Sequence, residues 1–197
     1  VAPITSLVHL IATKDGTCVN TTANLKLSES DFSDLSRYID VKRGEVYTAK
    51  GVIFVEGIAE EYLVPSFAKA MGLDLDRLGV VVCNINSTNF KPYCDFAGAL
   101  GIPHVVITDG DYYHAEGDDK CYNDLEDASH QNKGFDGLDR CHDMFSDVEG
   151  KDYDKWSFSE RREHFATLGA FVGEYTLEVD IFKTANENDQ KTTDYYF

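Results

Sequence analysis

Four acidic residues follow two short apolar stretches of the chain, in positions where they could bind metal ions together. Glu56 and Glu60 come after the stretch VIFV, and Asp109 and Asp111 come after VVIT. Carboxylate oxygens are the ligands that Mg²⁺ prefers. Two such ions about 3.5–4 Å apart can stabilise both the attacking and the leaving oxygen of a phosphodiester displacement. The residue types therefore predict a metal site for phosphodiester chemistry.

Each of these acids also has an ordinary structural explanation. Glu60 would lie in the first turn of a helix, where the helix dipole favours a negative charge. Aspartate and glycine are common in turns, so the sequence DGD at 109–111 is weak evidence when it is taken alone. Glu56 is harder to explain in this way, because an acid at the end of a buried strand must be solvated or bind a ligand. The combination of the two motifs carries the prediction.

The middle of the chain is predicted to place these acids at one edge of a sheet. Its pattern predicts strands at 51–55, 80–84 and 104–108, with helices at 60–71 and 91–100 between them. This β-α-β-α-β order implies an α/β fold, with a parallel sheet flanked by helices and right-handed crossovers. Ligand sites in such sheets lie beyond the carboxyl ends of the strands.

The flanking segments are less regular. Residues 4–13 predict a strand, and 31–39 a helix. The stretch 112–155 is rich in Asp, Gly, Asn and Lys, and we interpret it as a long polar insertion that is partly helical at best. A capping box, SFSE at 157–160, predicts the start of another helix. The apolar stretch 171–182 begins like a strand.

The bulk composition narrows the classes of function. A chain of 197 residues with 43% hydrophobic residues fits one domain with a core. The net charge of −17 argues against a basic nucleic-acid-binding face. It does not exclude a nucleic-acid enzyme, because bound metal ions reverse the local charge of a carboxylate site. Five cysteines without a CxxC pair favour a reduced, cytoplasmic interior. No signal peptide or membrane-spanning apolar run is visible.

Three motifs resemble the Toprim metal-binding domain, which topoisomerases, primases and certain nucleases share: VEG at 55–57, DGD at 109–111 and TLE at 176–178. Over about residues 40–112 the chain resembles the Toprim domain of OLD (overcoming lysogenization defect) family nucleases, in which an ABC-type ATPase precedes the nuclease. The resemblance implies a Toprim-type, Rossmann-like fold and an endonuclease that cleaves DNA with two Mg²⁺ or Mn²⁺ ions. It also implies that ATP acts only through an ATPase domain of the same polypeptide, a homo-oligomeric full-length protein and a role in phage defence.

The resemblance further implies which residues form the site. The implied metal ligands are Glu56, Glu60, Asp109, Asp111 and Glu178, with a hydroxyl from Thr176. Glu56 and Asp109 are also the predicted catalytic acids. The apolar neighbours of Glu178 favour it over Glu174 as the acid that faces inward.

Basic residues of the site are harder to assign from the sequence. Family members use a lysine downstream of the last acid, and Lys183 is our candidate, with Lys191 or a residue beyond Phe197 as alternatives. Arg161 and Arg162 could bind phosphate groups of a substrate, or they could pair with surface acids along their helix.

The resemblance also suggests how the chain is organised. Residues 1–48 would be the tail of a preceding ATPase region, and 49–182 the Toprim domain with the insertion 112–156 inside it. Residues 183–197 would be a polar C-terminal segment leading to a missing or helical region. The chain begins with valine, and we interpret it as a fragment of a longer protein.

Other functions remain open at this point. A non-catalytic acidic interaction module could keep the Toprim fold for assembly, while an ATPase partner carries the activity. A haloacid-dehalogenase-like phosphatase also uses a D-x-D motif, although its nucleophile normally follows an early strand. A zinc site is disfavoured because the spacing of its candidate ligands fits no common pattern; these are Cys121, His130, Cys141 and His142.

Overall fold

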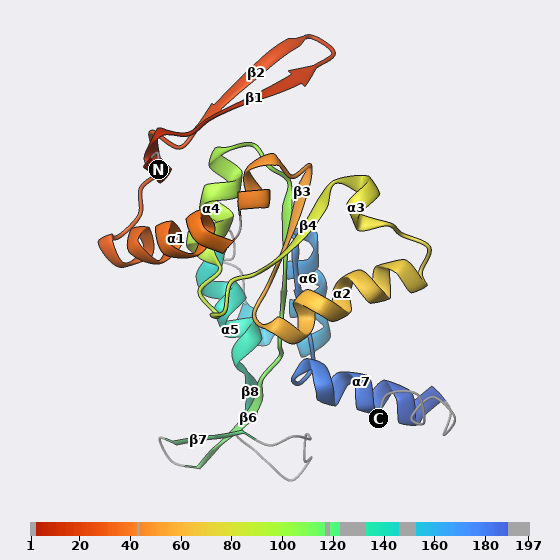
Figure 1. The fold of residues 1–197 in the computed structure, drawn as a ribbon. Helices are drawn as coiled ribbons and strands as arrows, with labels where there is room; N and C mark the ends of the chain where they lie inside the picture. Colours follow the sequence, from red (N-terminus) through yellow and green to blue (C-terminus); the bar gives the residue numbers. More distant parts are fainter. Residues whose placement is uncertain (1–2, 43, 117–118, 123–132, 146–152, 189–197) are drawn as a thin grey trace. The chain divides into compact units, whose positions relative to one another are not determined.

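The structure is a computed structural model, shown as a ribbon in Figure 1. It describes residues 3–42, 44–116, 119–122, 133–145 and 153–188. The chain forms two compact units, Val1–Val106 and Ile107–Phe197, and the division between them falls inside the strand β5. Each unit is described separately below.

The first unit begins with a hairpin and a helix. A short 3-10 turn, Ile4–Ser6, precedes the strands β1 (Val8–Thr13) and β2 (Gly16–Thr21), which pair in antiparallel fashion. The predicted strand at 4–13 is therefore confirmed only from Val8 onward. The helix α1 spans Glu29–Lys42 and is followed by a 3-10 turn at Gly44–Thr48.

The rest of the first unit has the predicted alternation of strands and helices (Figure 1). The elements are β3 (Gly51–Val55), α2 (Ile58–Ala70), α3 (Leu75–Leu78), β4 (Val80–Asn84), α4 (Lys91–Ala99) and β5 (His104–Thr108). The strands β3 and β4 are parallel and pair along their whole length. β5 lies beside β3, and the amide of Val52 donates to the carbonyl of Pro103 over 2.9 Å. The predicted α/β fold with a parallel sheet is confirmed.

The core of this unit explains why the strand ends are well defined. Phe54 and Val55 of β3 are fully buried, as are Cys83 of β4 and Phe96 of α4. Burying a large apolar side chain contributes about 1.5–3 kcal/mol. These buried side chains fix the register of β3, so Glu56, the residue after Val55, lies at the carboxyl end of the strand.

The second unit contains a sheet that the sequence did not predict. The strands β6 (Tyr112–Glu116), β7 (Asp119–Tyr122) and β8 (Lys133–Phe135) form an antiparallel sheet in the order β7-β6-β8, and α5 (Asp136–Met144) follows. The interpretation of 112–155 as irregular and at most partly helical was therefore wrong for these residues. The alternation that defines β6 is short: Tyr112 and His114 are buried, whereas Tyr113 between them is partly exposed.

The remaining elements of the second unit support the strand end of β5. A 3-10 turn at Tyr153–Lys155 precedes α6 (Phe158–Thr167), whose predicted capping box is confirmed. The strand β9 (Ala170–Val172) lies beside β5, where the amide of Gly173 donates to the carbonyl of Thr108 over 2.9 Å, and α7 spans Leu177–Asn188. The stretch 171–182 is thus a strand only at its start. No helix within the described ranges is long and apolar enough to cross a membrane.

Candidate functional site

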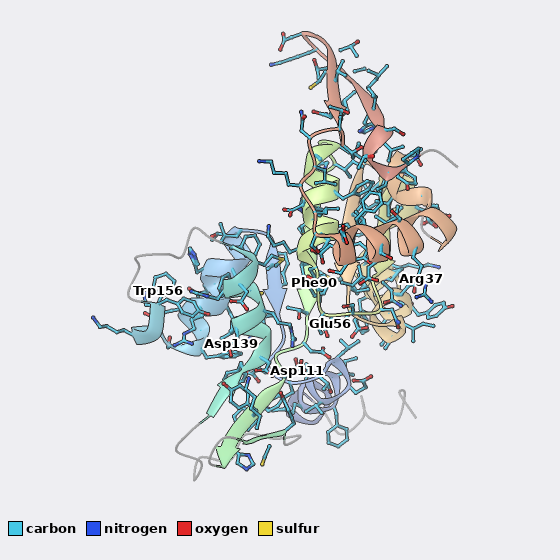
Figure 2. All side chains as sticks on the ribbon, turned by 90° about the vertical axis from the view of Figure 1, so that its left-hand side faces the viewer. Arg37, Glu56, Phe90, Asp111, Asp139 and Trp156 are labelled. Atoms are coloured by element: carbon cyan, nitrogen blue, oxygen red, sulfur yellow. The ribbon has the colours of Figure 1, made fainter. Side chains whose placement is uncertain are left out.

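In the first unit, the turn after β3 carries Glu56 and Glu60. Glu56 directly follows the strand and is partly exposed (Figure 2), whereas Glu60 is buried, with 8% of its surface exposed. The Glu60 carboxylate accepts a hydrogen bond from the amide of Gly57 over 3.1 Å. It thereby satisfies an amide that the helix α2 leaves without a helical partner. Glu60 has the structural role that its place in the first turn suggested, and its role as a metal ligand stays a prediction.

The last residue of β4 and the loop after it carry side-chain amides that the sequence pattern did not assign to the site. Asn84 lies opposite Val55 in the parallel pair and is buried, with 6% of its surface exposed. Its side-chain oxygen accepts a hydrogen bond from the amide of Asn86 over 2.6 Å, and Asn86 has a left-handed backbone with φ of 51°. The signal was present in the sequence as the polar run NINSTN directly after VVVC. These amides lie at the end of the strand next to β3.

In the second unit, the DGD turn is tightly packed around Gly110. The amide of Gly110 donates to the carbonyl of Tyr175 over 2.8 Å. A Cβ atom at this position would lie 2.2 Å from the carbonyl oxygen of Glu174, so only glycine fits. Asp111 has a left-handed backbone with φ of 48°, a conformation that costs a non-glycine residue about 1–2 kcal/mol. Packing on both sides of the turn holds this backbone in place.

The start of α5 packs against the other side of the same turn. The amide of Gly137 donates to the carbonyl of Gly110 over 3.0 Å, and a Cβ atom on Gly137 would lie 2.0 Å from the carbonyl oxygen of Asp109. The amide of Asp136 donates to the carbonyl of Asp111 over 3.3 Å. The two aspartates are therefore presented by a backbone with little freedom to move.

A basic residue of α5, Arg140, binds the same turn and was also missed. One guanidinium nitrogen lies 2.8 Å from Oδ2 of Asp111. The other donates to the carbonyl of Asp109 over 2.9 Å and to the hydroxyl of Thr108 over 3.1 Å. No local pattern could have identified Arg140, because its partners lie about thirty residues earlier in the chain.

The acid that faces inward near α7 is Asp180, and the prediction for Glu178 is wrong in this respect. Glu178 is exposed, whereas Asp180 accepts hydrogen bonds from the amides of Glu174 over 2.9 Å and of Tyr175 over 3.2 Å. Burial raises the pKa of Asp180, although these two amides oppose the shift. The prediction took the apolar neighbours of Glu178 as a sign that its side chain faces inward. The chain is helical from Leu177, and on a helix the adjacent residues do not share a face with Glu178.

Thr176 lies at the N-terminal end of α7, where its carbonyl accepts a hydrogen bond from the amide of Asp180 over 3.0 Å. Lys183 lies about two turns after Thr176 along α7. Its ammonium is 3.4 Å from a carboxylate oxygen of Glu174 and 4.1 Å from the ring centre of Tyr175. Burial lowers the pKa of Lys183, but Tyr175 and Glu174 outweigh this effect and the pKa is raised overall. Lys183 is therefore a charged residue near the 173–175 segment that supports Gly110. Lys191 lies outside the described residues.

Both arginines of α6 stack on aromatic rings. The guanidinium of Arg161 lies 4.5 Å from the ring centre of Tyr153 and donates to the carbonyl of Trp156 over 3.1 Å. That of Arg162 lies 5.3 Å from the ring centre of Phe158. A role of these arginines in binding substrate stays a prediction.

The chemistry of the donor groups fits a hard cation. The acids that follow β3 and those of the DGD turn offer only carboxylate oxygens, which are the ligands that Mg²⁺ and Mn²⁺ prefer. Zn²⁺ prefers thiolates and imidazoles, which these residues do not offer. Within the described part of the chain, no three His, Cys, Asp or Glu side chains stand close enough together to form a ready metal site. Of the zinc candidates, His130 lies outside the described residues. Within its own unit each of two predicted ligands already has a partner, Gly57 for Glu60 and Arg140 for Asp111.

Comparison with known proteins identifies the central segment. Residues 48–111 match the family model "Overcoming lysogenization defect protein-like, TOPRIM domain". The chain is 27% identical over 101 residues to "Endonuclease GajA" of Bacillus cereus (strain HuB5-5), and 31% identical over 85 residues to "Uncharacterized protein YbjD" of Escherichia coli (strain K12). These matches cover 51% and 43% of the chain but only 15% of each relative, so the chain spans a small part of the proteins it resembles.

Solved structures with similar sequences include the C-terminal regions of two OLD proteins. The C-terminal region of the Burkholderia pseudomallei OLD protein is 34% identical, with a TM-score of 0.48, and the match covers 70% of this chain and 59% of that one. The C-terminal region of the Xanthomonas campestris pv. campestris OLD protein is 29% identical, with a TM-score of 0.49, covering 77% and 69%.

Proposed function

We propose that this chain, whose residues 48–111 are a TOPRIM domain of the overcoming lysogenization defect type, is the nuclease part of a protein that cleaves DNA with the help of Mg²⁺ or Mn²⁺. The observation that carries the proposal is the position of the acids in the matched segment. Glu56 directly follows β3, and Asp109 directly follows β5, its neighbour in the sheet. Carboxylates that follow the strands of an α/β sheet are suited to hold the metal ions that phosphodiester cleavage uses. The related protein GajA is named an endonuclease.

Five acids are proposed as the metal ligands of the reaction. They are Glu56, Glu60, Asp109, Asp111 and Glu178, of which Glu178 is exposed. Bound ions would supply an activated water molecule and stabilise the charge on the phosphate. The protein supplies orientation: the packing around Gly110 fixes both aspartates before any ligand arrives.

The cations of the second unit would meet the charge of the substrate. Lys183 is the proposed catalytic lysine, and its ammonium lies near Glu174 and Tyr175. Arg161 and Arg162 are proposed to contact phosphate groups of the DNA. A chain with a net charge of −17 needs such local cations and bound metal ions to approach DNA. An ATPase region in the same polypeptide, homo-oligomers and a role in phage defence are proposed for the complete protein.

Plasmid nicking tests the proposal directly. The protein is incubated with supercoiled plasmid and Mg²⁺ or Mn²⁺, and nicked and linear forms are quantified. Glu56→Ala and Asp109→Ala should reduce nicking by at least a hundredfold, because each removes a proposed metal ligand. Asp95→Ala is the matched control, since Asp95 only pairs with Lys91 on the exposed side of α4. Nicking by both ligand variants at the rate of the control would refute the assignment.

A non-catalytic interaction module is the second candidate. It is favoured by one observation: Asp111, one of the proposed ligands, already has a cationic partner in Arg140. Calorimetry with Mn²⁺ separates the two functions, because the nuclease must bind the ion and the interaction module need not. Failure of the wild-type chain to bind Mn²⁺ at millimolar concentrations would favour the interaction module.

A further inference from the structure

Arg140 is the described cation that contacts the DGD turn most extensively. Its guanidinium contacts the side chain of Thr108, the backbone of Asp109 and the side chain of Asp111. The side chains of Arg140 and Asp111 are 21% and 27% exposed, so their ion pair is only partly screened by water. A planar guanidinium can make these contacts at once, which the single ammonium of a lysine cannot.

These contacts have two opposite consequences for a metal ion at Asp111. They orient the turn, because the hydrogen bonds to Thr108 and Asp109 fix the backbone from which both aspartates project. They also place a positive charge 2.8 Å from one oxygen of Asp111. A divalent ion that binds this carboxylate must share it with the guanidinium or displace it, and the two cations repel each other.

We propose that Arg140 is a positioning residue that serves as the resident counter-cation of Asp111, and that a divalent metal ion binds this carboxylate in competition with it. The inference rests on the proposed function, since it assumes that Asp111 is a metal ligand. Arg140 therefore lowers the affinity for the metal ion while it keeps Asp111 in the orientation that cleavage needs. Metal affinity and cleavage rate respond in opposite directions to its removal.

Isothermal calorimetry with MnCl₂ on the full 197-residue chain measures the first response. Arg140→Gln should bind Mn²⁺ roughly threefold to tenfold more tightly than the wild type, the change that corresponds to losing a partly exposed ion pair. Arg77→Gln is the matched control, because Arg77 is exposed on α3 and the substitution changes the net charge equally. A rearranged or loosened turn would instead weaken binding.

A double substitution shows whether the effect passes through Asp111. In an Asp111→Asn background the carboxylate is absent, so adding Arg140→Gln should no longer tighten Mn²⁺ binding. Arg140→Lys keeps the charge but makes fewer contacts, and its affinity should lie between those of the wild type and Arg140→Gln. If Arg140→Gln does not fold, as judged by circular dichroism, Arg140→Lys alone decides: it must bind Mn²⁺ more tightly than the wild type.

Cleavage of plasmid at saturating Mn²⁺ measures the second response, and Arg140→Gln should lower the rate while Arg140→Lys partly restores it. Three results would overturn the inference: unchanged or weaker Mn²⁺ binding by Arg140→Gln relative to Arg77→Gln, tighter binding that persists in the Asp111→Asn background, or an unchanged cleavage rate. Failure of the wild type to bind Mn²⁺ would instead contradict the proposed function. The two failures are therefore distinguishable.

Discussion

Replacing Gly110 by alanine tests whether packing around the DGD turn holds its two aspartates in place. The new Cβ atom would lie 2.2 Å from the carbonyl oxygen of Glu174 and 2.5 Å from that of Gly173, whereas ordinary contacts begin at 3.4 Å. These neighbours are backbone atoms, which cannot rotate away as a side chain can. The turn or the 173–175 segment must therefore move by more than 1 Å.

The expected cost of this movement follows from two contributions. Overpacking of a well-packed region costs about 1–3 kcal/mol. Loss of the hydrogen bond from the amide of Gly110 to the carbonyl of Tyr175 adds about 0.5–1.5 kcal/mol. Together they lower the free energy of unfolding of the second unit by about 2–4 kcal/mol. With a urea dependence of about 2 kcal/mol per molar, the midpoint should fall by about 1–2 M.

Tryptophan fluorescence during urea unfolding provides the assay. Trp156 is the single tryptophan of the chain and belongs to the second unit, so its emission reports on the unit that contains Gly110. Gly44→Ala is the matched control, because a Cβ atom there meets nothing within 4 Å, and its midpoint should match that of the wild type. A Gly110→Ala protein that unfolds within about 0.5 kcal/mol of the wild type would refute the reasoning, since a surface substitution does no more.

Two further predictions use the same fluorescence assay. Asp180→Ala should lower the free energy of unfolding by about 2–3 kcal/mol, because it leaves the amides of Glu174 and Tyr175 without their acceptor. Glu178→Ala removes an exposed acid and should change the free energy of unfolding by less than about 0.5 kcal/mol. Equal effects of the two substitutions would contradict the assignment of Asp180 as the inward-facing acid. Burial raises the pKa of Tyr153 from 10.0 to about 12. The unfolded state therefore loses this proton first as the pH rises, so stability should fall as the pH rises above 10 and level off near 12. Tyr153→Phe should lack this part of the pH dependence, and an unchanged slope in that variant would show that other groups cause it.

The positions of the acids in the chain could be predicted from the sequence because strand ends are marked locally. β-branched runs stop at Glu56 and at Asp109, and glycine follows each of them. The same local signals predicted the strands 51–55, 80–84 and 104–108, and the structure has strands with these bounds. Helix ends were less accurate, and α2 begins at Ile58 rather than at Glu60. Backbone hydrogen bonding and capping near a terminus decide such boundaries.

The sheet β7-β6-β8 could not be predicted from the composition of its segment. Its strands are three to five residues long. They are stabilised by pairing between Tyr113 and Tyr122 and between Tyr112 and Phe135, and the second pair lies far apart in the sequence. A polar composition describes the average of a segment and not the few cross-strand contacts that stabilise it. The error at Glu178 has a related origin, because apolar neighbours in the sequence do not show which way a side chain on a helix points.

The sequence by itself determined which acids follow the strands of the sheet. Their residue types and places predict hard-cation ligands, and residues 48–111 match a TOPRIM family model. Only the tertiary structure decided how these acids are held. Arg140 reaches Asp111 from a helix twenty-nine positions later, Asp180 turns inward while Glu178 does not, and Gly110 is enclosed by the backbone of 173–175. These contacts join residues far apart in the chain, so their geometry depends on packing that no local sequence pattern records.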